Sequence, residues 1–425
     1  MTINGTSGDD TLTGTSGDDS FNLSQGGNDT VTGLGGNDAF SFGSAFTVAD
    51  HVDGGTGTDT LKLNGDYSAL AEFEAATLTG VERIVVAAGH NYALHLADAN
   101  VAAGATLSVD ASALGAGNKL TFTDPAETDG SLAITGGAGN DTIWGGLVHT
   151  SIVSGGGNDT IDLFGGVNIV NAGDGDDGLE IFGPISSTSR FDGGAGNNTI
   201  YLSGDFSAGQ VVGKGWGTNI NDFGMTAGNN YKLSFQDGLI AAGHTLSFFA
   251  NGLTADNHVI LNASHLTTGN IVLQGGDGND TLIGGGGNDT FEGRGGTDTM
   301  TGGAGADMFE FNTVADSTGA AFDRITDFHA SSGEHMYFGA VPGHIDAEVT
   351  SGAINASHFD AKLAAAIGAT QLHAGDAVLF TPTVGYLTGH TLLVVDHNGV
   401  AGYQAGADYV VDVTGMTGTL TTGDF

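Results

Sequence analysis

The chain is poor in several residue types that most soluble domains use. It contains no Cys, 4 Pro and 9 Lys+Arg among 425 residues. The absence of Cys excludes thiol catalysis and disulfide bonds, although it does not fix the compartment. The few basic residues stand against 49 Asp+Glu, so the formal net charge is −40. Such a chain repels DNA, RNA and anionic membrane surfaces but attracts cations, and we therefore expect no nucleic-acid partner.

Long apolar runs and catalytic signatures are also missing. No stretch is long enough to cross a bilayer as a helix. The start, MTINGTSGDDTLTG, has no basic and no apolar region, so we expect no Sec-type signal peptide. The sequence has no H-E-x-x-H, no nucleophile elbow and no P-loop, and its 14 His are scattered. We therefore predict no enzymatic activity, no catalytic residue and no organic cofactor. Paired carboxylates such as Asp9-Asp10 leave an unrecognised site open as an alternative.

Glycine, by contrast, is abundant, with 76 residues, and it is ordered into repeats. Residues 275–310 read GGDGNDTLI, GGGGNDTFE, GRGGTDTMT and GGAGADMFE, four consecutive nine-residue units. This is the glycine-rich nonapeptide of calcium-binding parallel β-helices. The glycines permit positive φ and close backbone approach, and the Asp offers the hard oxygen that Ca²⁺ prefers. The predicted metal-site residues of this block are Asp280, Asp289, Asp298, Asp307, Gly276, Gly278, Gly285 and Gly287.

Each unit also predicts a very short strand. The triplet after the Asp has an apolar middle residue (Leu282, Phe291, Met300 and Phe309), which should point inward. Two units would form one coil. Asp280 would then lie over Asp298 on one edge of the solenoid and Asp289 over Asp307 on the other, with calcium between successive turns.

Two further blocks carry the same motif. In residues 5–40 the predicted calcium ligands are Asp10, Asp19, Asp29 and Asp38, with Leu12, Phe21, Val31 and Phe40 pointing inward. In the block that begins at residue 136 they are Asp141, Asp159 and Asp177. These three lie eighteen residues apart, which is two periods, so only one edge of that block should bind calcium.

The segments between the blocks are duplicated. Residues 52–69 match 191–208, residues 89–109 match 228–248, and residues 130–146 match 269–285. Each copy opens on a degenerate calcium turn, with Asp59 in the first and Asn198 in the second. An amide keeps the oxygen but loses the charge, so Asn198 should make a weaker site than Asp59. Duplication of this kind is what a stacked solenoid permits.

We therefore predict an all-β protein, a right-handed parallel β-roll or β-helix solenoid with a β-rich C-terminal cap. The last region should contain a helix over 355–367 and strands at 377–380, 390–396 and 408–413. The expected segments are a nonapeptide β-roll at 1–40, irregular coils at 41–135, a second β-roll at 136–190, irregular coils at 191–274, a third β-roll at 275–310 and a cap at 311–425.

On these motifs the chain resembles the RTX family, calcium-binding repeat proteins that bacterial type I secretion systems export. FDRITDF (322–328) resembles the segment that follows the last repeat, and the C-terminal stretch is similar to that of alphaproteobacterial S-layer proteins. The N-terminus resembles small signalling proteins of the RTX family. The resemblance implies a C-terminal export signal, a partner in the type I machinery, disorder at low calcium and folding outside the cell from the C-terminus.

The sequence leaves three functions open. The first is a secreted, non-enzymatic, S-layer-like protein of the cell surface or matrix, which binds several Ca²⁺ ions and associates with itself or with surface polysaccharide. The second is a signalling or membrane-active protein that forms cation channels. The third is an extracellular enzyme whose site lies in the irregular coils.

Overall fold

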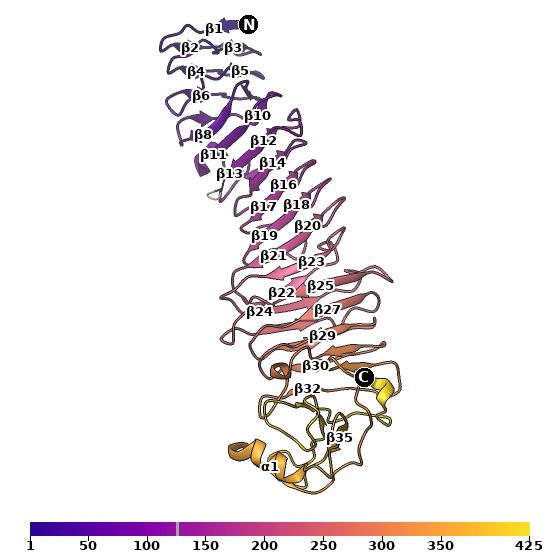
Figure 1. The fold of residues 1–425 in the computed structure, drawn as a ribbon. Helices are drawn as coiled ribbons and strands as arrows, with labels where there is room; N and C mark the ends of the chain where they lie inside the picture. Colours follow the sequence, from indigo (N-terminus) through magenta and orange to yellow (C-terminus); the bar gives the residue numbers. More distant parts are fainter. Residues whose placement is uncertain (125–126) are drawn as a thin grey trace. The chain divides into compact units, whose positions relative to one another are not determined.

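The computed structural model describes residues 1–124 and 127–425, so two residues of the expected segment 41–135 lie outside it. Figure 1 shows the ribbon of the chain, coloured from the N-terminus to the C-terminus, with its strands labelled. By its internal contacts the chain divides into two compact units. The first unit comprises residues 1–202 and 215–221, and the second comprises residues 203–214 and 222–425. In both units the strands of a sheet are joined by crossovers, because sequential strands alternate between sheets. The described part of the chain has no helix that is long and apolar enough to span a membrane.

The first unit consists of three parallel sheets. One sheet has the order β1 (Thr2–Asn4), β3 (Ser20–Asn22), β5 (Ala39–Phe42), β7 (Thr60–Leu63), β10 (Arg83–Val86), β12 (Thr106–Asp110), β14 (Ser131–Thr135), β16 (Thr150–Val153), β18 (Asn168–Asn171) and β20 (Arg190–Asp192). A second has β2 (Thr11–Thr13), β4 (Thr30–Thr32), β6 (His51–Asp53) and β9 (Leu78–Thr79). The third has β8 (Tyr67–Phe73), β11 (Tyr92–Leu96), β13 (Leu120–Thr123), β15 (Thr142–Trp144), β17 (Thr160–Leu163), β19 (Gly178–Phe182) and β21 (Thr199–Ser203).

Register in these sheets follows the repeat length. Ile143 pairs with Ile161, and Ile161 pairs with Leu179 on the next strand. All three side chains are fully buried. Because alternate residues of a strand face opposite sides of the sheet, an eighteen-residue spacing keeps the apolar residue of every coil in the core.

The second unit is built in the same way. One sheet has the order β22 (Phe206–Val212), β24 (Tyr231–Phe235), β26 (Val259–Asn262), β28 (Thr281–Ile283), β30 (Thr299–Thr301), β32 (Asp323–Ile325), β38 (Tyr409–Asp412), β37 (Leu392–Val395) and β35 (Ala377–Phe380). A second sheet of this unit contains β23 (Asp222–Met225), β25 (Thr245–Phe249), β27 (Asn270–Gln274), β29 (Thr290–Glu292), β31 (Met308–Glu310) and β33 (His335–Tyr337). The unit also contains the pair β34 (Ala353–Ile354) and β36 (Val384–Gly385).

The nonapeptide strands lie where the motif places them. β28 to β31 coincide with the four predicted triplets, and their middle residues Leu282, Phe291, Met300 and Phe309 are fully buried. The rings of Phe291 and Phe309 stack at 5.1 Å between centroids. These predictions are confirmed. In the first block Phe21, Val31 and Phe40 are buried, but the prediction for Leu12 is only partly right. Leu12 is half-buried because β2 is the first strand of its sheet and has a neighbour on one side alone.

The duplicated segments fold alike. β8 and β22 are each seven residues long, and each carries a register shift where it pairs with the next strand. Tyr67 stacks on Tyr92 in the first copy, with 5.8 Å between ring centroids, and Phe206 stacks on Tyr231 in the second, at 5.6 Å. The duplication read from the sequence is therefore also a duplication of structure.

The C-terminal region is rich in strands, as predicted. β35, β37 and β38 pair antiparallel, and β38 then pairs in parallel with β32 of the solenoid. The expected helix is present as a short 3-10 turn, η3 (Ala356–His358), followed by α1 (Phe359–Ala366). The remaining 3-10 turns are η1 (Asp98–Asn100), η2 (Val314–Asp316) and η4 (Thr422–Asp424). A separate apolar core forms around Leu363, Phe380 and Val410.

Candidate calcium-binding turns

The nonapeptide aspartates form ladders that run from coil to coil. The backbone amide of Asp280 donates to Oδ1 of Asp298 at 2.7 Å, and the amide of Asp289 donates to Oδ1 of Asp307 at 2.8 Å. Asp280 thus lies over Asp298 and Asp289 over Asp307, as the eighteen-residue spacing predicts. All four side chains are buried at the edges of the solenoid. Each carboxylate is therefore held in place by the coil that precedes it.

The second carboxylate oxygen has two different environments. In the turns that open the third block, Oδ2 of Asp280 accepts from the Gly276 amide, and Oδ2 of Asp289 accepts from the Gly285 amide, both at 2.7 Å. Asp141 accepts in the same way from Gly137. In later turns Oδ2 is buried with no hydrogen-bond partner, and this holds for Asp29, Asp38, Asp59, Asp159, Asp177, Asp298, Asp307 and Asp323. We call the first kind closed turns and the second kind open turns.

Backbone conformation separates the two kinds of turn. In the open turn of Asp298, Arg294 has φ 72° and Gly296 has φ 120°. Gly303 and Gly305 play the same part before Asp307. The closed turns around Gly276, Gly278, Gly285 and Gly287 lack these positive φ values. The left-handed residues turn the amide away from the carboxylate, so an open turn leaves a buried oxygen free for another ligand.

The four predicted glycines serve close approach rather than positive φ. A Cβ on Gly278 would lie 1.6 Å from the Asn257 carbonyl oxygen, and one on Gly287 would lie 1.9 Å from that of Gly269. The expectation that these glycines would also supply left-handed turns is wrong at these positions, because each stack opens on a closed turn. The glycine that begins the unit matters as well: a Cβ on Gly293 would lie 2.3 Å from Oδ2 of Asp298.

In the first block the aspartate ladders extend beyond the nonapeptide units. The amide of Asp10 donates to Asp29 and that of Asp29 to Asp50. On the other edge the ladder runs from Asp19 through Asp38 and Asp59 to Glu82, and the last amide bond measures 2.7 Å. The turns of Asp10 and Asp19 are closed, because Oδ2 accepts from the amides of Thr6 and Thr15. Asp59 is therefore a full member of a ladder, and Asp50 and Glu82 extend it beyond the predicted ligands.

The second block has a single ladder. The amide of Asp141 donates to Asp159, that of Asp159 to Asp177, and that of Asp177 to Oδ1 of Asn198. The opposite edge carries Thr150 and Asn168 at the corresponding places, as the first residues of strands β16 and β18, as the sequence predicts for an edge without aspartates. The Asn198 side-chain amide donates to the Asn219 carbonyl oxygen. That hydrogen bond is consistent with the expectation of a weaker site there.

The third block continues past its last nonapeptide. The amide of Asp298 donates to Oδ1 of Asp323 at 2.7 Å, and Oδ2 of Asp323 has no partner. We did not predict Asp323, Asp50 or Glu82 as ligands. A signal was present, since in each case the second residue along is a buried apolar strand residue (Ile325, Val52 and Ile84), as in the nonapeptides. Of the glycines that make the motif recognisable, only Gly80 before Glu82 and Gly319 before Asp323 are present there.

Burial makes these carboxylates poor anions on their own. It raises the pKa of Asp298 to about 8, that of Asp159 to about 7, and those of Asp280 and Asp307 to about 6. Burial and the neighbouring Asp298 raise the pKa of Asp323 well above its usual value. A buried charge without a partner is costly, and a bound cation removes that cost.

The residues of the open turns fit calcium. Ca²⁺ takes six to eight oxygen ligands from carboxylates and backbone carbonyls. An open turn supplies a buried, unpartnered carboxylate oxygen, and the tight glycine turns bring carbonyl oxygens of adjacent coils close together. In the closed turns of Asp141, Asp280 and Asp289, by contrast, both carboxylate oxygens accept hydrogen bonds from backbone amides. We therefore assign the ion-holding role mainly to the free oxygens of the open turns.

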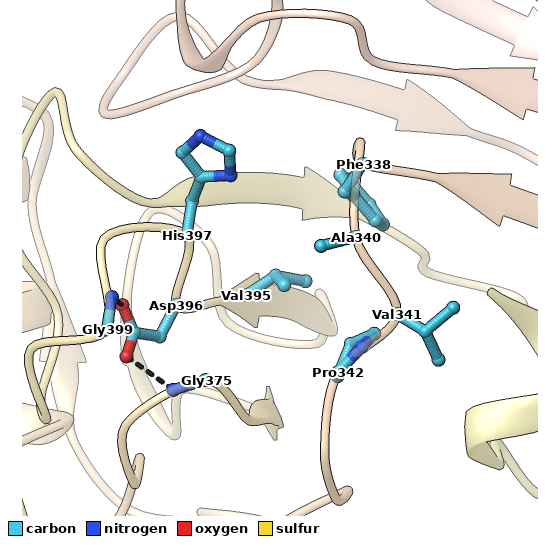
Figure 2. A pocket seen from close by; sticks show the side chains of 9 residues that line it. All are labelled: Phe338, Ala340, Val341, Pro342, Gly375, Val395, Asp396, His397 and Gly399. Atoms are coloured by element: carbon cyan, nitrogen blue, oxygen red, sulfur yellow. Dashed lines mark hydrogen bonds between the residues drawn. The ribbon is translucent and has the colours of Figure 1, made fainter.

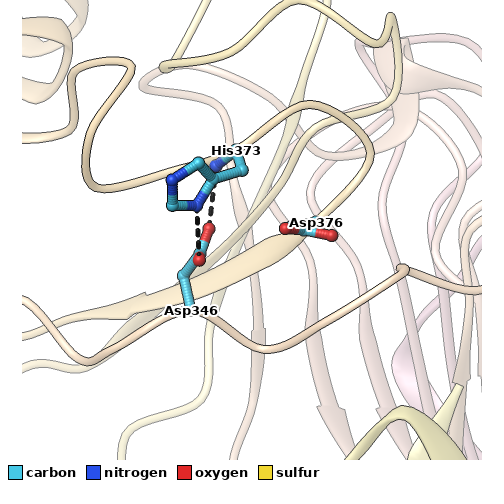
Figure 3. Close-up of side chains that lie close together, drawn as sticks. All are labelled: Asp346, His373 and Asp376. Carbon is cyan, nitrogen blue, oxygen red and sulfur yellow. Dashed lines mark hydrogen bonds and ion pairs between the residues drawn. The ribbon is translucent and has the colours of Figure 1, made fainter.

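A different group of side chains gathers in the C-terminal region. Ligand atoms of Asp346, His373 and Asp376 lie within 4.8 Å of one another (Figure 3). His373 bonds to Asp346 through Nδ1 at 2.7 Å and through its amide at 2.8 Å, and Asp376 accepts from the His344 amide. The Asp346 carboxylate raises the pKa of His373. Asp346 and His373 are thus bonded to each other, and this contact links the segment of Asp346 to that of His373.

The same region contains a small cavity of about 180 Å³ (Figure 2). Phe338, Val341 and Pro342 line one side of it, and Asp396 and His397 line the other. Asp396 accepts from the amides of Gly375 and Gly399, so its carboxylate shapes the loop next to the cavity. The cavity thus has apolar side chains on one side and the consecutive residues Asp396 and His397 on the other.

Comparison with known protein families identifies the segments that contain the aspartate ladders. The family model of the RTX calcium-binding nonapeptide repeat matches residues 2–26, 24–45, 133–147, 150–179, 189–205 and 274–309. The matched segments include every predicted nonapeptide aspartate of the three blocks, and also Asn198. A search of curated proteins found no significant match. The matched segments are RTX calcium-binding nonapeptide repeats, stacked as successive coils of a parallel β-solenoid.

Proposed function

We propose that this chain is a secreted, non-enzymatic structural protein of the cell surface or extracellular matrix, S-layer-like in role, which folds on binding calcium. The buried, unpartnered carboxylate oxygens of the open turns carry the proposal. They belong to residues that are 0–2% exposed, for example Asp298 and Asp307 at 0%. A cation between coils is therefore part of the fold itself, not an addition to a finished surface.

Charge explains why calcium would act as the switch. At a net charge of −40 the calcium-free chain repels itself, and the ladders concentrate that repulsion along the edges of the solenoid. Extracellular calcium modules bind at roughly 10⁻⁴–10⁻³ M. Sites of that strength stay empty in the cytosol and fill outside the cell. The RTX repeats favour export by a type I secretion system, which passes unfolded chains, and this order of events suits it.

The folding part of the proposal is tested by circular dichroism of the full chain. In chelator the spectrum should be that of a largely unfolded chain, and millimolar CaCl₂ should restore the β-signal. Magnesium at the same concentration serves as the control, because it demands smaller, more regular sites. A chain that is fully folded in chelator would refute the coupling of folding to calcium.

The structural role needs a separate test. The calcium-loaded protein should form ordered arrays, or bind producing cells or their polysaccharide, in electron microscopy and sedimentation assays. Ion conductance in planar bilayers would instead support a channel, and turnover of an extracellular substrate would support an enzyme. A calcium-loaded protein that stays monomeric and binds neither cells nor polysaccharide would contradict the structural role.

A further inference from the structure

Three carboxylates meet outside the nonapeptide ladders, in the irregular coils of the first unit. Oxygens of Asp98, Glu127 and Asp129 all lie within 4.8 Å of one another. Asp98 follows strand β11, whereas Glu127 and Asp129 follow strand β13, which pairs with β11 in register. The group therefore joins two adjacent coils in a stretch that has no calcium turn of the nonapeptide type.

Glu127 is the unusual member of the group. Its side chain is 0% exposed, and Oε2 has no hydrogen-bond partner. Oε1 accepts from the amides of Asp129 at 2.9 Å and Gly130 at 2.5 Å, which fixes the carboxylate in place. In the described part of the chain no Lys, Arg or His forms an ion pair with any of the three carboxylates. A buried carboxylate with one free oxygen and two acidic neighbours calls for a cation.

The second copy of the duplication shows what this position otherwise holds. Residues 130–146 match 269–285, so Glu127 corresponds to Leu266. The packing agrees, because a Cβ on Gly146 would meet the Glu127 side chain and one on Gly285 would meet that of Leu266. Leu266 is a buried core residue, only 3% exposed. The first copy has thus placed a carboxylate where the fold accepts a leucine.

Of the other two carboxylates, that of Asp98 is shared by the two copies and that of Asp129 is found in the first copy alone. Asp98 corresponds to Asp237, and both carboxylates bind a threonine of the next coil: Thr128 N donates to Asp98 at 2.8 Å and Thr267 N donates to Asp237 at 3.0 Å. That contact is shared and needs no ion. At the position of Asp129 the second copy has Thr268. Glu127 and Asp129 are therefore both additional carboxylates, added around a coil contact that both copies make.

From this we infer a calcium site formed by Asp98, Glu127 and Asp129, distinct from the nonapeptide ladders. The ligands are all hard oxygens, as Ca²⁺ requires, and the oxygen separations suit metal–oxygen distances of roughly 2.3–2.6 Å. The ion would fasten the coil of β11 to the coil of β13. In the second copy the buried Leu266 occupies the corresponding position, after strand β26, where it brings no carboxylate. The inference rests on these residues and stands independently of the proposed function.

The number of bound calcium ions tests the inference. The full chain, refolded in CaCl₂, should bind one ion fewer by native mass spectrometry when it carries Glu127→Leu, the residue of the second copy. Asp98→Asn with Asp129→Asn, which leaves the buried position intact, should also lose one ion. The matched control is Asp237→Asn in the second copy, which should leave the count unchanged. Circular dichroism in calcium checks that each variant is folded.

A crystal structure of the calcium-loaded chain gives a second reading. An anomalous peak among the three carboxylates of the wild type, absent in the Asp98→Asn, Asp129→Asn variant, would support the site. An unchanged ion count in that folded variant, or no peak in the wild type at millimolar CaCl₂, would overturn it. If Glu127→Leu fails to fold, the double Asn variant decides the matter alone.

Discussion

The amide of Asp298 donates to Oδ1 of Asp323 across 2.7 Å, so the third nonapeptide of the last block is bonded to the first strand beyond the repeats. Asp323 begins strand β32, which pairs with β30 on one side and with β38 of the C-terminal region on the other. The backbone amide of Asp323 donates to Ser317 Oγ, which in turn donates to the Val410 carbonyl oxygen. The calcium ladder and the C-terminal region therefore share a residue.

Removing a charged ligand from an open turn should weaken calcium-induced folding. Asp298→Asn keeps the size of the side chain but removes the charge of a buried, unpartnered oxygen. We expect the calcium midpoint of folding, followed by circular dichroism, to rise by about ten-fold or more. Asp277→Asn is the matched control, because Asp277 lies exposed in the same block. Equal shifts in the two variants would mean that net charge alone matters.

Loss of the shared residue should uncouple the C-terminal region from the repeats. In Asp323→Ala the amides around strand β32 lose the carboxylate that holds the last coil. The backbone amides of strands β37 and β38 should then become protected from hydrogen exchange only at a higher calcium concentration than in the wild type. Glu348→Ala, which removes an exposed acid of the same region, is the control. Unchanged protection of β37 and β38 in Asp323→Ala would show that the region folds without the ladder.

Glycine at the fourth position of the repeat should matter only inside a stack. A Cβ on Gly287 would lie 1.9 Å from the Gly269 carbonyl oxygen, whereas one on Gly17, at the same position of its repeat, meets nothing within 4 Å. Gly287→Ala should therefore lower the free energy of unfolding in calcium by about 1–3 kcal/mol. Gly17→Ala should leave it nearly unchanged, because no coil precedes its turn. Denaturant titration of the calcium-loaded chain separates the two.

Acid should partly replace calcium. The pKa values of Asp298 and Asp159, about 8 and 7, lie above the usual 3.8, so the folded chain binds protons where the unfolded chain does not. These bound protons stabilise the calcium-free folded chain. The stabilisation is complete below about pH 4 and is lost as the pH rises through 7 to 8. A calcium-free chain prepared by dialysis should therefore show more β-signal at pH 5 than at pH 8.

Calcium affinity should increase as the pH rises, whereas the stability of the calcium-free chain should decrease. The reason is that the ion must displace the protons bound to these carboxylates. The calcium midpoint should fall as the pH rises from 5 to 8. Asp298→Asn should reduce the pH dependence of the calcium-free chain, since the group with the raised pKa is gone. A β-signal that grows with pH in the absence of calcium would contradict this account.

The sequence by itself determined the regular part of the molecule. A nine-residue period with one apolar residue in phase allows one arrangement, so the strands β28 to β31 and their buried residues could be read directly. The eighteen-residue step likewise predicted that Asp280 lies over Asp298. It described the turn of Asp59 as degenerate, yet Asp59 lies in a ladder and has a buried carboxylate oxygen without a hydrogen-bond partner.

Tertiary structure decided everything that depends on coils of unequal length. Asp50, Glu82 and Asp323 reach the ladders through steps of 21, 23 and 25 residues, which no fixed period reveals. The difference between closed and open turns has the same origin, since it depends on whether a calcium turn of the preceding coil lies beneath. The proximity of Asp98 and Glu127 likewise depends on how the coils stack. Local sterics repeat along the chain and can be read from it, whereas contacts between coils exist only once the coils are stacked.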